Sequence, residues 1–474
     1  MIPDSLAALE QRLAEDLLWL NQPPKDWMIP REGVLDVAVI GGGVMGLVTL
    51  AALRRLGVTH IRAFDKAPAG REGPWVTFAR METLRTRKEA AGPALGVPSL
   101  TFRAWYEAQF GREAWDRMVL APREMWMDYL VWYRRVLDLP VTNDTRVTAV
   151  QPEGALVRLD LEGSEGAASV LARRVVLATG LDGLGAPALP AVARKVDARF
   201  VAHGADMIDM AALKGRRVAV VGAGASAMDN AAAALEAGAA SCDIFVRRPD
   251  IPRVDKFTGI GSPGMTHGYL GLPDAVKWAY MVEGERAQIP PPRHSVQRVA
   301  RNAGARFHLA SPILDLVEEG EGVTVVTPKG RYPVDFVIFA TGFSADLRER
   351  PEFAALEGRV LLWRDMHRPA PDMEHDGIGA MPYLGPAFEF LPKRPGDNVS
   401  HIHCFAYPAV PSHGKITSGV PAISDGAQRL AQGIARSLFV EDADPHLARF
   451  RAFATPELLG DEWTDADLEE TTHV

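Results

Sequence analysis

Three glycines near the start of the chain have the spacing of a loop that can hold a diphosphate. Gly41, Gly43 and Gly46 follow directly after the apolar run 34–40 and lead into the small-residue run 47–57. In such a loop the first glycine permits a tight turn, the second lets a diphosphate approach the backbone, and the third lets the helix pack on the strand. The helix start adds unpaired N–H groups and a partial positive charge for phosphate oxygens. The spacing therefore predicts a dinucleotide site.

An acidic residue follows this turn at the end of the next apolar run, 60–65. Asp65 stands about 20 positions after the last glycine, where a carboxylate can accept hydrogen bonds from a ribose diol. Because a carboxylate repels a 2′-phosphate, this site favours an unphosphorylated ribose such as that of FAD. The alternative is an ordinary strand–helix–strand unit whose glycines serve only the turn.

The same pattern returns in the middle of the chain. Gly222 and Gly224 follow the apolar run 216–221, and Ser226 and Ala227 complete the turn. Alanine in the third position is within the pattern for nucleotide turns. The sequence therefore predicts a second nucleotide module with its own helix at 228–239.

The end of the next apolar run separates the two modules. The first module has Asp65 there, whereas the second has Arg247 and Arg248. Guanidinium groups bind a 2′-phosphate through paired hydrogen bonds, so the second site favours NADPH. The alternative is that both arginines are solvated surface charges.

Two further apolar runs, 173–180 and 335–342, both end in Ala-Thr-Gly, which adds Thr179, Gly180, Thr341 and Gly342 to the expected cofactor-binding residues. We expect the chain to leave the first domain at the first run and to return at the second. The fold class is thus α/β with two Rossmann-like dinucleotide-binding domains, the NADPH domain inserted into the FAD domain. The predicted units are an N-terminal helical extension (1–33), the FAD domain (34–185 and 335–440), the NADPH domain (186–334) and a C-terminal tail (441–474).

Composition excludes several other classes of protein. The formal net charge is −8, opposite in sign to that of most nucleic-acid binders. Two cysteines, Cys242 and Cys404, cannot build a disulfide framework and include no C-x-x-C, which fits a reducing cytoplasm and argues against disulfide reductase chemistry. No apolar run reaches the roughly 18–20 residues that a membrane span needs, and the N-terminus lacks the pattern of a signal peptide.

The order of these elements resembles that of the class B flavoprotein monooxygenases, a group of flavin-containing, N-hydroxylating and Baeyer–Villiger enzymes. The stretch 64–75, which includes Lys66, resembles the family's segment after the first turn, and Trp75 would then lie near the flavin. The run 145–150 resembles the strand that holds the adenine and points to Val147, and the Ala-Thr-Gly-Phe at 340–343 is similar to a motif near the end of family members.

The resemblance implies FAD and NADPH as cofactors, with O₂ and a small molecule as substrates. NADPH would reduce FAD, O₂ would add to give a hydroperoxyflavin, and one oxygen atom would pass to the substrate, in first place to nitrogen or sulfur. The alternatives are an NADPH-dependent flavin reductase or dehydrogenase without oxygenation, and a protein that only senses the nucleotides.

Baeyer–Villiger chemistry is a further alternative, against which one departure weighs. His203 aligns with the histidine of the family fingerprint, but Asp197, Arg199 and Met207 stand where phenylalanine, glycine and an aromatic residue are expected.

Substrate residues are expected on three segments that interrupt the modules. The segment 249–278 is long for a strand connection, and long connections inside compact domains are often functional. The other two are 75–88, after the first turn, and 407–421, before the last helix. From these we predict catalytic roles for Arg85, Lys256 and His267 and a cofactor contact for Thr86, with His413 and Lys415 as further polar residues.

We predict no metal site. His401 and His403 could hold a metal only in isolation, and alternate residues of a strand more often pack or pair. A homo-oligomer is compatible with the sequence, which specifies no partner surface.

Overall fold

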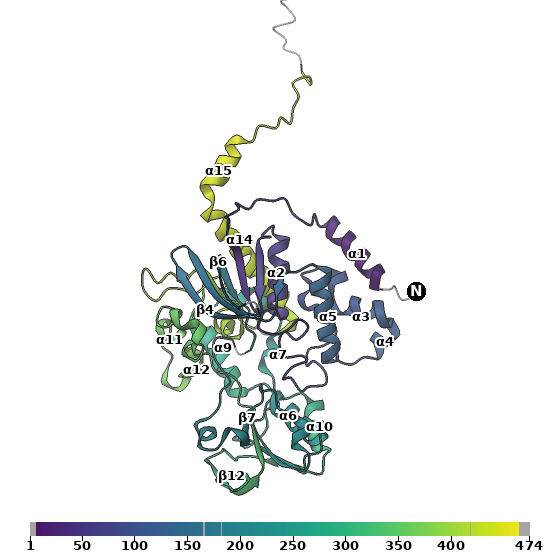
Figure 1. Cartoon of the computed structure of the whole chain (residues 1–474), viewed down its shortest axis with the longest axis vertical. Helices are drawn as coiled ribbons and strands as arrows, with labels where there is room; N and C mark the ends of the chain where they lie inside the picture. The colour runs from purple at the N-terminus through teal and green to yellow at the C-terminus, as the bar shows by residue number, and fades with distance from the viewer. Residues whose placement is uncertain (1–5, 165, 182, 418, 464–474) are drawn as a thin grey trace, which may run out of the picture.

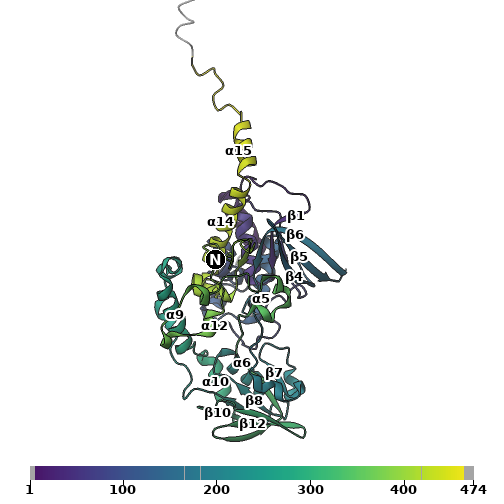
Figure 2. The ribbon, with the colours of Figure 1, turned by 90° about the vertical axis from the view of Figure 1, so that its left-hand side faces the viewer.

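The computed structural model describes residues 6–164, 166–181, 183–417 and 419–463. Within these residues the backbone forms a seven-stranded, a five-stranded and a three-stranded sheet. Figure 1 shows the largest sheet in an upper lobe and the two smaller sheets in a lower lobe. Figure 2, turned by 90°, shows the same separation.

The sheet of the upper lobe has a parallel part and an antiparallel part that share one long strand. The parallel part has the order β3–β2–β1–β6–β15. In the antiparallel part, β4 pairs with β5, and β5 pairs with the first half of β6. The strands are β1 (Val34–Ile40), β2 (Ile61–Phe64), β3 (Val141–Thr142), β4 (Thr145–Glu153), β5 (Leu156–Gly163), β6 (Gly166–Leu177) and β15 (Ile402–Cys404).

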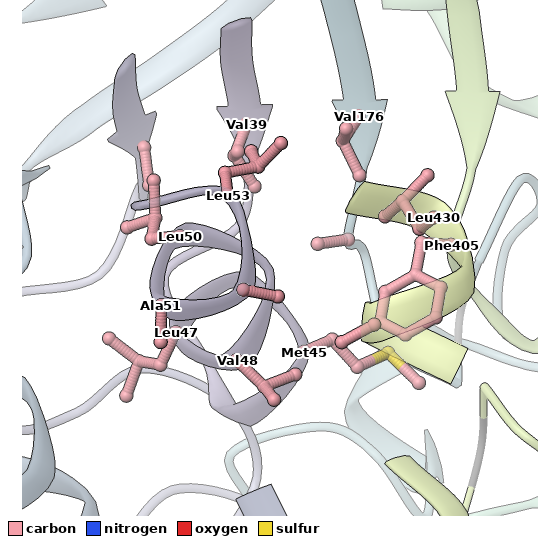
Figure 3. Close-up of a cluster of buried hydrophobic side chains, with 14 of the residues drawn as sticks. Val39, Met45, Leu47, Val48, Leu50, Ala51, Leu53, Val176, Phe405 and Leu430 are labelled. Atoms are coloured by element: carbon pink, nitrogen blue, oxygen red, sulfur yellow. The ribbon is translucent and has the colours of Figure 1, made fainter. Parts of the chain in front are cut away.

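Helices from both ends of the chain cover the upper sheet. Side chains of α2 pack towards Val39 of β1 and Val176 of β6, and Leu430 of α14 packs beside them (Figure 3). Every residue of α2 from Met45 to Leu53 is buried, which explains why its sequence is apolar all round. The helices of this lobe are α1 (Leu6–Trp19), α2 (Val44–Arg55), α3 (Phe102–Phe110), α4 (Arg112–Arg117), α5 (Arg123–Val136) and α14 (Ile423–Glu441).

The five-stranded sheet of the lower lobe is wholly parallel, in the order β10–β9–β8–β14–β7. Its core is formed with α6 (Ala225–Glu236) and α10 (Arg293–Ala300), and the antiparallel strands β11 (Asp315–Glu319), β12 (Gly322–Thr327) and β13 (Gly330–Val334) lead into β14. The parallel strands are β7 (Val201–His203), β8 (Arg217–Val221), β9 (Ser241–Phe245), β10 (Ala305–His308) and β14 (Phe336–Phe339).

The placement of β14 corrects one sequence expectation. The strand at 335–342 was expected to return to the first domain, but β14 pairs with β8 and β7 of the lower lobe. β14 begins one residue after β13 ends, and the strand edge nearest to it is that of β8, with which it pairs. The strand that returns to the upper sheet is β15, whose three residues pair with the end of β6. The second sheet thus lies, in sequence, between β6 and β15.

The region between the lobes contains one longer helix, α9 (Asp274–Ala287), and the short helices α7 (Lys256–Ile260), α8 (Pro263–Gly268), α11 (Trp363–Met366), α12 (Asp376–Gly379) and α13 (Val410–His413). Trp278 of α9 packs against Trp363 of α11 in a small apolar cluster of its own. The segment that follows β9 therefore packs on elements that follow β14 in the chain.

The C-terminal region differs from the expected tail. It contains α15 (Ala443–Ala452), a helix without buried residues that projects from the top of the upper lobe in Figure 1. Residues 464–474 of the expected tail lie outside the described residues. Among the helices of the described part, none has the length and apolar character needed to cross a bilayer.

Candidate nucleotide and substrate sites

Two of the three glycines in the first turn, Gly41 and Gly46, leave no room for a side chain. Gly41 has a φ of +108°, and a Cβ atom there would lie 2.5 Å from the Ala178 carbonyl oxygen. A Cβ atom at Gly46 would collide with the Gly41 carbonyl oxygen. Gly43 forms the N-cap of α2 and provides no side-chain cap, which leaves backbone N–H groups at the helix start for a ligand. This is the local geometry of a diphosphate cradle.

Asp65 lies beside this turn and holds its backbone. Its carboxylate accepts hydrogen bonds from the N–H groups of Gly42 and Ala67, each at 2.7 Å. Each carboxylate oxygen keeps a further lone pair for a ribose hydroxyl. A cavity of ≈ 300 Å³ opens next to Gly42 and Gly43. Lys66, which follows Asp65 in the chain, is exposed.

Trp75 and Val147 occupy different surroundings. Trp75 is half-buried, its ring edge-on to Trp126 at 6.1 Å between centroids, and Arg123 holds its carbonyl oxygen at 2.7 Å. The Val147 side chain is buried in the core of the upper lobe, next to an irregularity in the pairing of β4 with β5. Only its backbone is therefore available to a ligand.

The second glycine turn repeats the first contact with different partners. A Cβ atom at Gly222 would lie 2.7 Å from the Ala340 carbonyl oxygen, as Gly41 faces Ala178. Gly224 is the uncapped N-cap of α6, and a Cβ atom there would meet nothing within 4 Å. Ala227 is buried under the turn, and Ser226 is exposed beside it. The approach to this helix start is open.

The two arginines after β9 have separate environments. Arg248 donates to the Arg286 carbonyl oxygen at 2.7 Å and to that of Glu285 at 3.4 Å, at the C-terminal end of α9. Arg247 is exposed and makes no hydrogen bond or ion pair with the described residues. Arg247 is thus the guanidinium available for a phosphate, whereas Arg248 fixes a helix end.

The two Ala-Thr-Gly ends mark the connections between the lobes. The Thr179 hydroxyl donates to the Gly183 carbonyl oxygen at 2.6 Å, and the Thr341 hydroxyl donates to that of Ala188 at 2.5 Å. Pro187 and Phe343 form an antiparallel bridge. Gly180 and Gly342 both have positive φ, which lets each chain turn away from its strand. The two connections therefore run side by side.

The segments expected to carry substrate residues meet only in part. Arg85 donates to Asp255 and to the Pro290 carbonyl oxygen, each at 3.0 Å, which joins the segment 75–88 to the segment after β9. Lys256 lies next to Asp255 but pairs with Glu283 at 3.1 Å and is exposed. His267 on α8 is exposed, and Thr86 is half-buried. Of the three predicted catalytic side chains, two therefore lie at this contact.

Several residues at this junction were not singled out from the sequence. Arg80 donates to the carbonyl oxygens of Gly204 and Asp206, at 3.1 and 2.9 Å. Burial lowers the pKa of Arg80. Tyr407 lies against Glu285, and burial raises the pKa of its hydroxyl to about 12. The long connections were the only signal in the sequence, since these contacts join residues far apart in it.

Three of the five histidines considered in the sequence, His203, His403 and His413, are buried. His203 accepts from the Ala205 N–H and lies edge-on to Phe343, and burial lowers its pKa. His413 stacks on Phe388, and burial lowers its pKa to about 3. The pKa of His403 is also lowered to about 3 by burial. These rings are therefore neutral at pH 7. Among the described residues no cluster of three or more His, Cys, Asp or Glu could hold a metal ion.

The two cysteines lie in different sheets. Cys242 is buried in β9 and Cys404 in β15, and burial raises the pKa of each thiol to about 12. Both thiols are therefore protonated and inert at neutral pH. Two such residues cannot form a redox pair.

Comparison with known proteins identifies the family. The model of the pyridine nucleotide-disulphide oxidoreductases matches residues 35–360, and the chain belongs to this family. It is 40% identical to an FAD-dependent urate hydroxylase of Xanthomonas campestris pv. campestris, over 96% of this chain and 98% of the relative. The two cysteines of this chain, Cys242 and Cys404, lie in different sheets and are both free thiols.

Solved structures with the same fold include two ornithine hydroxylases. That of Pseudomonas aeruginosa is 16% identical with a TM-score of 0.67, covering 85% of this chain and 100% of the other. The ornithine N-hydroxylase of Kutzneria sp. 744, solved with reduced FAD, NADP⁺ and L-ornithine, is 17% identical with a TM-score of 0.65, covering 85% and 99%. The resemblance in fold to the class B monooxygenases, predicted from sequence, is confirmed.

Proposed function

We propose that the protein is an FAD- and NADPH-dependent monooxygenase that hydroxylates urate or a closely related planar anion. The observation that carries this proposal is the 40% identity to the urate hydroxylase over 96% of the chain. A match of that length extends over both lobes. Urate is a planar anion at neutral pH, so the enzyme must supply positive charge where it binds.

FAD fits the first glycine turn. Gly41, Gly43 and Gly46 leave the start of α2 free of side chains, and the adjoining cavity of ≈ 300 Å³ accepts part of a dinucleotide. Bound FAD would take a hydride from NADPH and pass electrons to O₂. We assign the remaining contacts of FAD to Asp65, Lys66, Trp75, Thr86, the Val147 backbone, Thr179 and Gly180.

NADPH fits the second turn. Gly222 and Gly224 leave the start of α6 open, and the exposed Arg247 supplies the charge for a 2′-phosphate. Ser226 and Ala227 complete this site, Arg248 supports it from behind by fixing α9, and Thr341 and Gly342 border it. We also propose that residues of the second sheet form a domain inserted into the first.

The junction between the lobes positions the two nucleotides and limits the access of water. Two arginines of the upper lobe each hold a segment that belongs to the lower lobe in sequence. Arg85 binds Asp255, and Arg80 binds the Gly204 carbonyl oxygen. Fixing both segments keeps the nucleotide ends at constant separation, which favours transfer between them. The apolar contact of Trp278 with Trp363 closes the same junction on another side.

Turnover with urate tests this proposal. FAD-loaded protein is mixed with NADPH in air, and NADPH consumption is followed with and without urate. The expected result is urate-dependent consumption, with one atom from isotopically labelled O₂ in the product. Equal consumption in both cases, with all O₂ converted to hydrogen peroxide, contradicts the proposal and favours a flavin reductase.

Amine N-hydroxylation is the second candidate, favoured by the fold shared with the ornithine hydroxylases. Ornithine, lysine and a thioether are therefore tested in the same assay. Coupled consumption of NADPH with one of these and none with urate would replace urate by an amine or sulfur substrate. Size-exclusion chromatography and cell fractionation test the expected homo-oligomer and the cytoplasmic location.

A further inference from the structure

Three segments that are far apart in the sequence meet between the lobes, around α7 (Figure 1). Arg85 comes from the connection after the first nucleotide turn, Asp255 from the start of α7, and Lys415 from the segment after α13. The Arg85–Asp255 ion pair, 3.0 Å long, joins the first two. Lys415 joins the third, because its ammonium lies 3.8 Å from the centroid of the Phe257 ring on α7.

The backbone around Lys415 is held firmly. Gly414 has a φ of +77° and packs against the ring of Tyr269, so that no side chain fits there. Ile416 is buried, and the Thr417 hydroxyl donates to the Ala406 carbonyl oxygen at 3.0 Å. A lysine between such neighbours has few backbone conformations open to it. The fold therefore fixes where the side chain starts, and the contact with the Phe257 ring places its ammonium at the junction.

The charge of Lys415 has no carboxylate partner. Within the described part of the chain no Asp or Glu oxygen lies within 4.0 Å of its nitrogen. The two nearby carboxylates are engaged elsewhere, Asp255 by Arg85 and the Phe257 N–H, and Glu285 by Gln288 and Tyr407. Lysines on the outside differ in this respect, since Lys393 pairs with Asp365 at 2.8 Å.

A half-buried ammonium without a counter-ion is costly unless a ligand supplies the opposite charge. Burial lowers the pKa of Lys415, although Asp255 and Glu285 act in the other direction. An anion bound directly to the ammonium would give it the close partner that Asp255 and Glu285 do not provide. The lysine also lies on the same segment as Tyr407, whose N–H donates to the Gly180 carbonyl oxygen at the end of the first Ala-Thr-Gly strand. The segment that carries Lys415 thus contacts the proposed FAD site at Gly180.

We propose that Lys415 binds the negatively charged edge of the substrate, a planar heteroaromatic anion of the urate type. The assignment rests on the proposed function and adds a specificity-determining residue to it. Lys415 forms a charge-assisted hydrogen bond to an oxygen of the anion, while the ring of Phe257 holds the far side of the ammonium. Arg85 remains with Asp255 and keeps α7 in place.

The test measures urate binding and turnover in variants of the FAD-loaded enzyme. Lys415→Gln removes the charge, Lys415→Arg keeps it, and Lys393→Gln is the matched control for loss of a lysine that has its own partner. Urate is titrated without NADPH under anaerobic conditions, with the flavin spectrum as the readout. KM for urate and for NADPH is then measured in air.

Loss of a charge-assisted hydrogen bond corresponds to a rise of about 10- to 100-fold in Kd and KM for urate in Lys415→Gln. KM for NADPH should stay unchanged, Lys415→Arg should recover most of the affinity, and Lys393→Gln should behave as the wild type. Unchanged Kd for urate in Lys415→Gln overturns the assignment of Lys415 and leaves the proposed function intact. Equal losses for urate and NADPH also overturn it, because they indicate a structural role. A wild type that neither binds nor hydroxylates urate overturns the proposed function and this assignment together.

Discussion

The two nucleotide modules have the same strand plan but close their glycine turns differently. The order β3–β2–β1–β6–β15 of the upper lobe corresponds strand for strand to β10–β9–β8–β14–β7 of the lower lobe. In both, the first glycine lies against the alanine of an Ala-Thr-Gly strand end. The upper turn then requires glycine at its third position, and the lower turn accepts Ala227. The difference shows that α2 lies closer to its turn than α6 does.

The modules also differ in the charges they bury. In the upper sheet, Arg173 is fully buried and contacts Asp36, Glu441 and Asp442 at 3.3, 3.3 and 2.7 Å. In the lower sheet, the carboxylate of Asp243 is buried, but its partner Arg306 is more than half exposed. The upper module thus buries both members of its Arg173–Asp36 pair, whereas the lower module buries only the carboxylate of its Arg306–Asp243 pair.

The largest effect is expected from exchanging the third turn residues. Gly46→Ala forces a methyl group into the Gly41 carbonyl oxygen, so a loss of more than about 4 kcal/mol in the free energy of unfolding and loss of FAD are expected. Ala227→Gly only adds backbone freedom to a helix and should cost about 1 kcal/mol. Thermal unfolding and the FAD content of the purified protein measure both. Similar losses in the two variants would contradict the difference between the turns.

The next effect concerns the buried ion pairs. Arg173→Met leaves the carboxylate of Asp36 buried without a counter-ion, whereas Asp442 keeps its ion pair with Arg31 at 2.9 Å. The loss should be about 3 kcal/mol. Arg306→Met removes an exposed partner and leaves His308 on Asp243, so a loss of at most about 1 kcal/mol is expected. Urea unfolding at neutral pH gives both values. A larger loss of unfolding free energy in Arg306→Met than in Arg173→Met would contradict this difference between the two ion-pair networks.

A smaller effect separates the arginines after β9. Arg247→Ala should raise KM for NADPH about 10- to 100-fold, because a charge-assisted hydrogen bond to the 2′-phosphate is lost. KM for NADH should not change. Arg248→Ala is the control: it frees the end of α9 and should lower stability by about 1 kcal/mol with little effect on nucleotide choice. Equal KM for NADPH in wild type and Arg247→Ala would show that Arg247 is a solvated surface charge that does not bind the 2′-phosphate.

The smallest effect is a difference in pH dependence between the two sheets. Burial raises the pKa of Asp243, but hydrogen bonds from Arg306 and His308 outweigh it and hold the pKa below its usual range. This contribution to stability is complete above the ordinary pKa near 4 and is lost as the pH falls through the lowered value. Asp243→Asn should remove that loss in acid and cost about 1 kcal/mol at pH 7.

Asp36 has the opposite sign. Burial raises its pKa more than Arg173 lowers it, so its ionisation removes stability as the pH rises through the raised value. In a plot of unfolding free energy against pH, Asp36→Asn should therefore flatten the neutral side of the curve, and Asp243→Asn should flatten its acid side. Unfolding free energies at a series of pH values, from acid to neutral, measure both slopes. Identical profiles for the two variants would rule out the difference.

The local part of each module could be predicted from the sequence, because it depends on neighbouring residues. The apolar runs became β1 and β8, and the small-residue runs became α2 and α6. Each helix begins about three residues before the predicted run, since the second glycine itself serves as the N-cap. The turns were predictable for the same reason: their glycines act on backbone atoms only a few positions away.

The long-range part could not be predicted. The run Phe336–Phe339 has the same apolar pattern whichever sheet it joins, and only the contact of Gly222 with Ala340 shows which turn it borders. Arg247 and Arg248 are equivalent in the sequence, but the end of α9 engages only one of them. Lys415 was visible as a polar residue, and its missing counter-ion follows from the positions of Asp255 and Glu285, which no local pattern fixes. The catalytic roles of Arg85, Lys256 and His267 stay predictions.

The position of β7 determines where the chain enters and leaves the lower sheet. In each module one outer strand pairs with the strand that ends in Ala-Thr-Gly. In the upper module this outer strand is β15, the last of the module in chain order, whereas in the lower module it is β7, the first. The lower module is therefore a circular permutant of the upper one. Because β7 pairs with β14, the entry and exit of the lower sheet are neighbours. The chain therefore leaves and re-enters the upper lobe at one place, and β6 and β15, which flank the lower sheet in sequence, still pair with each other.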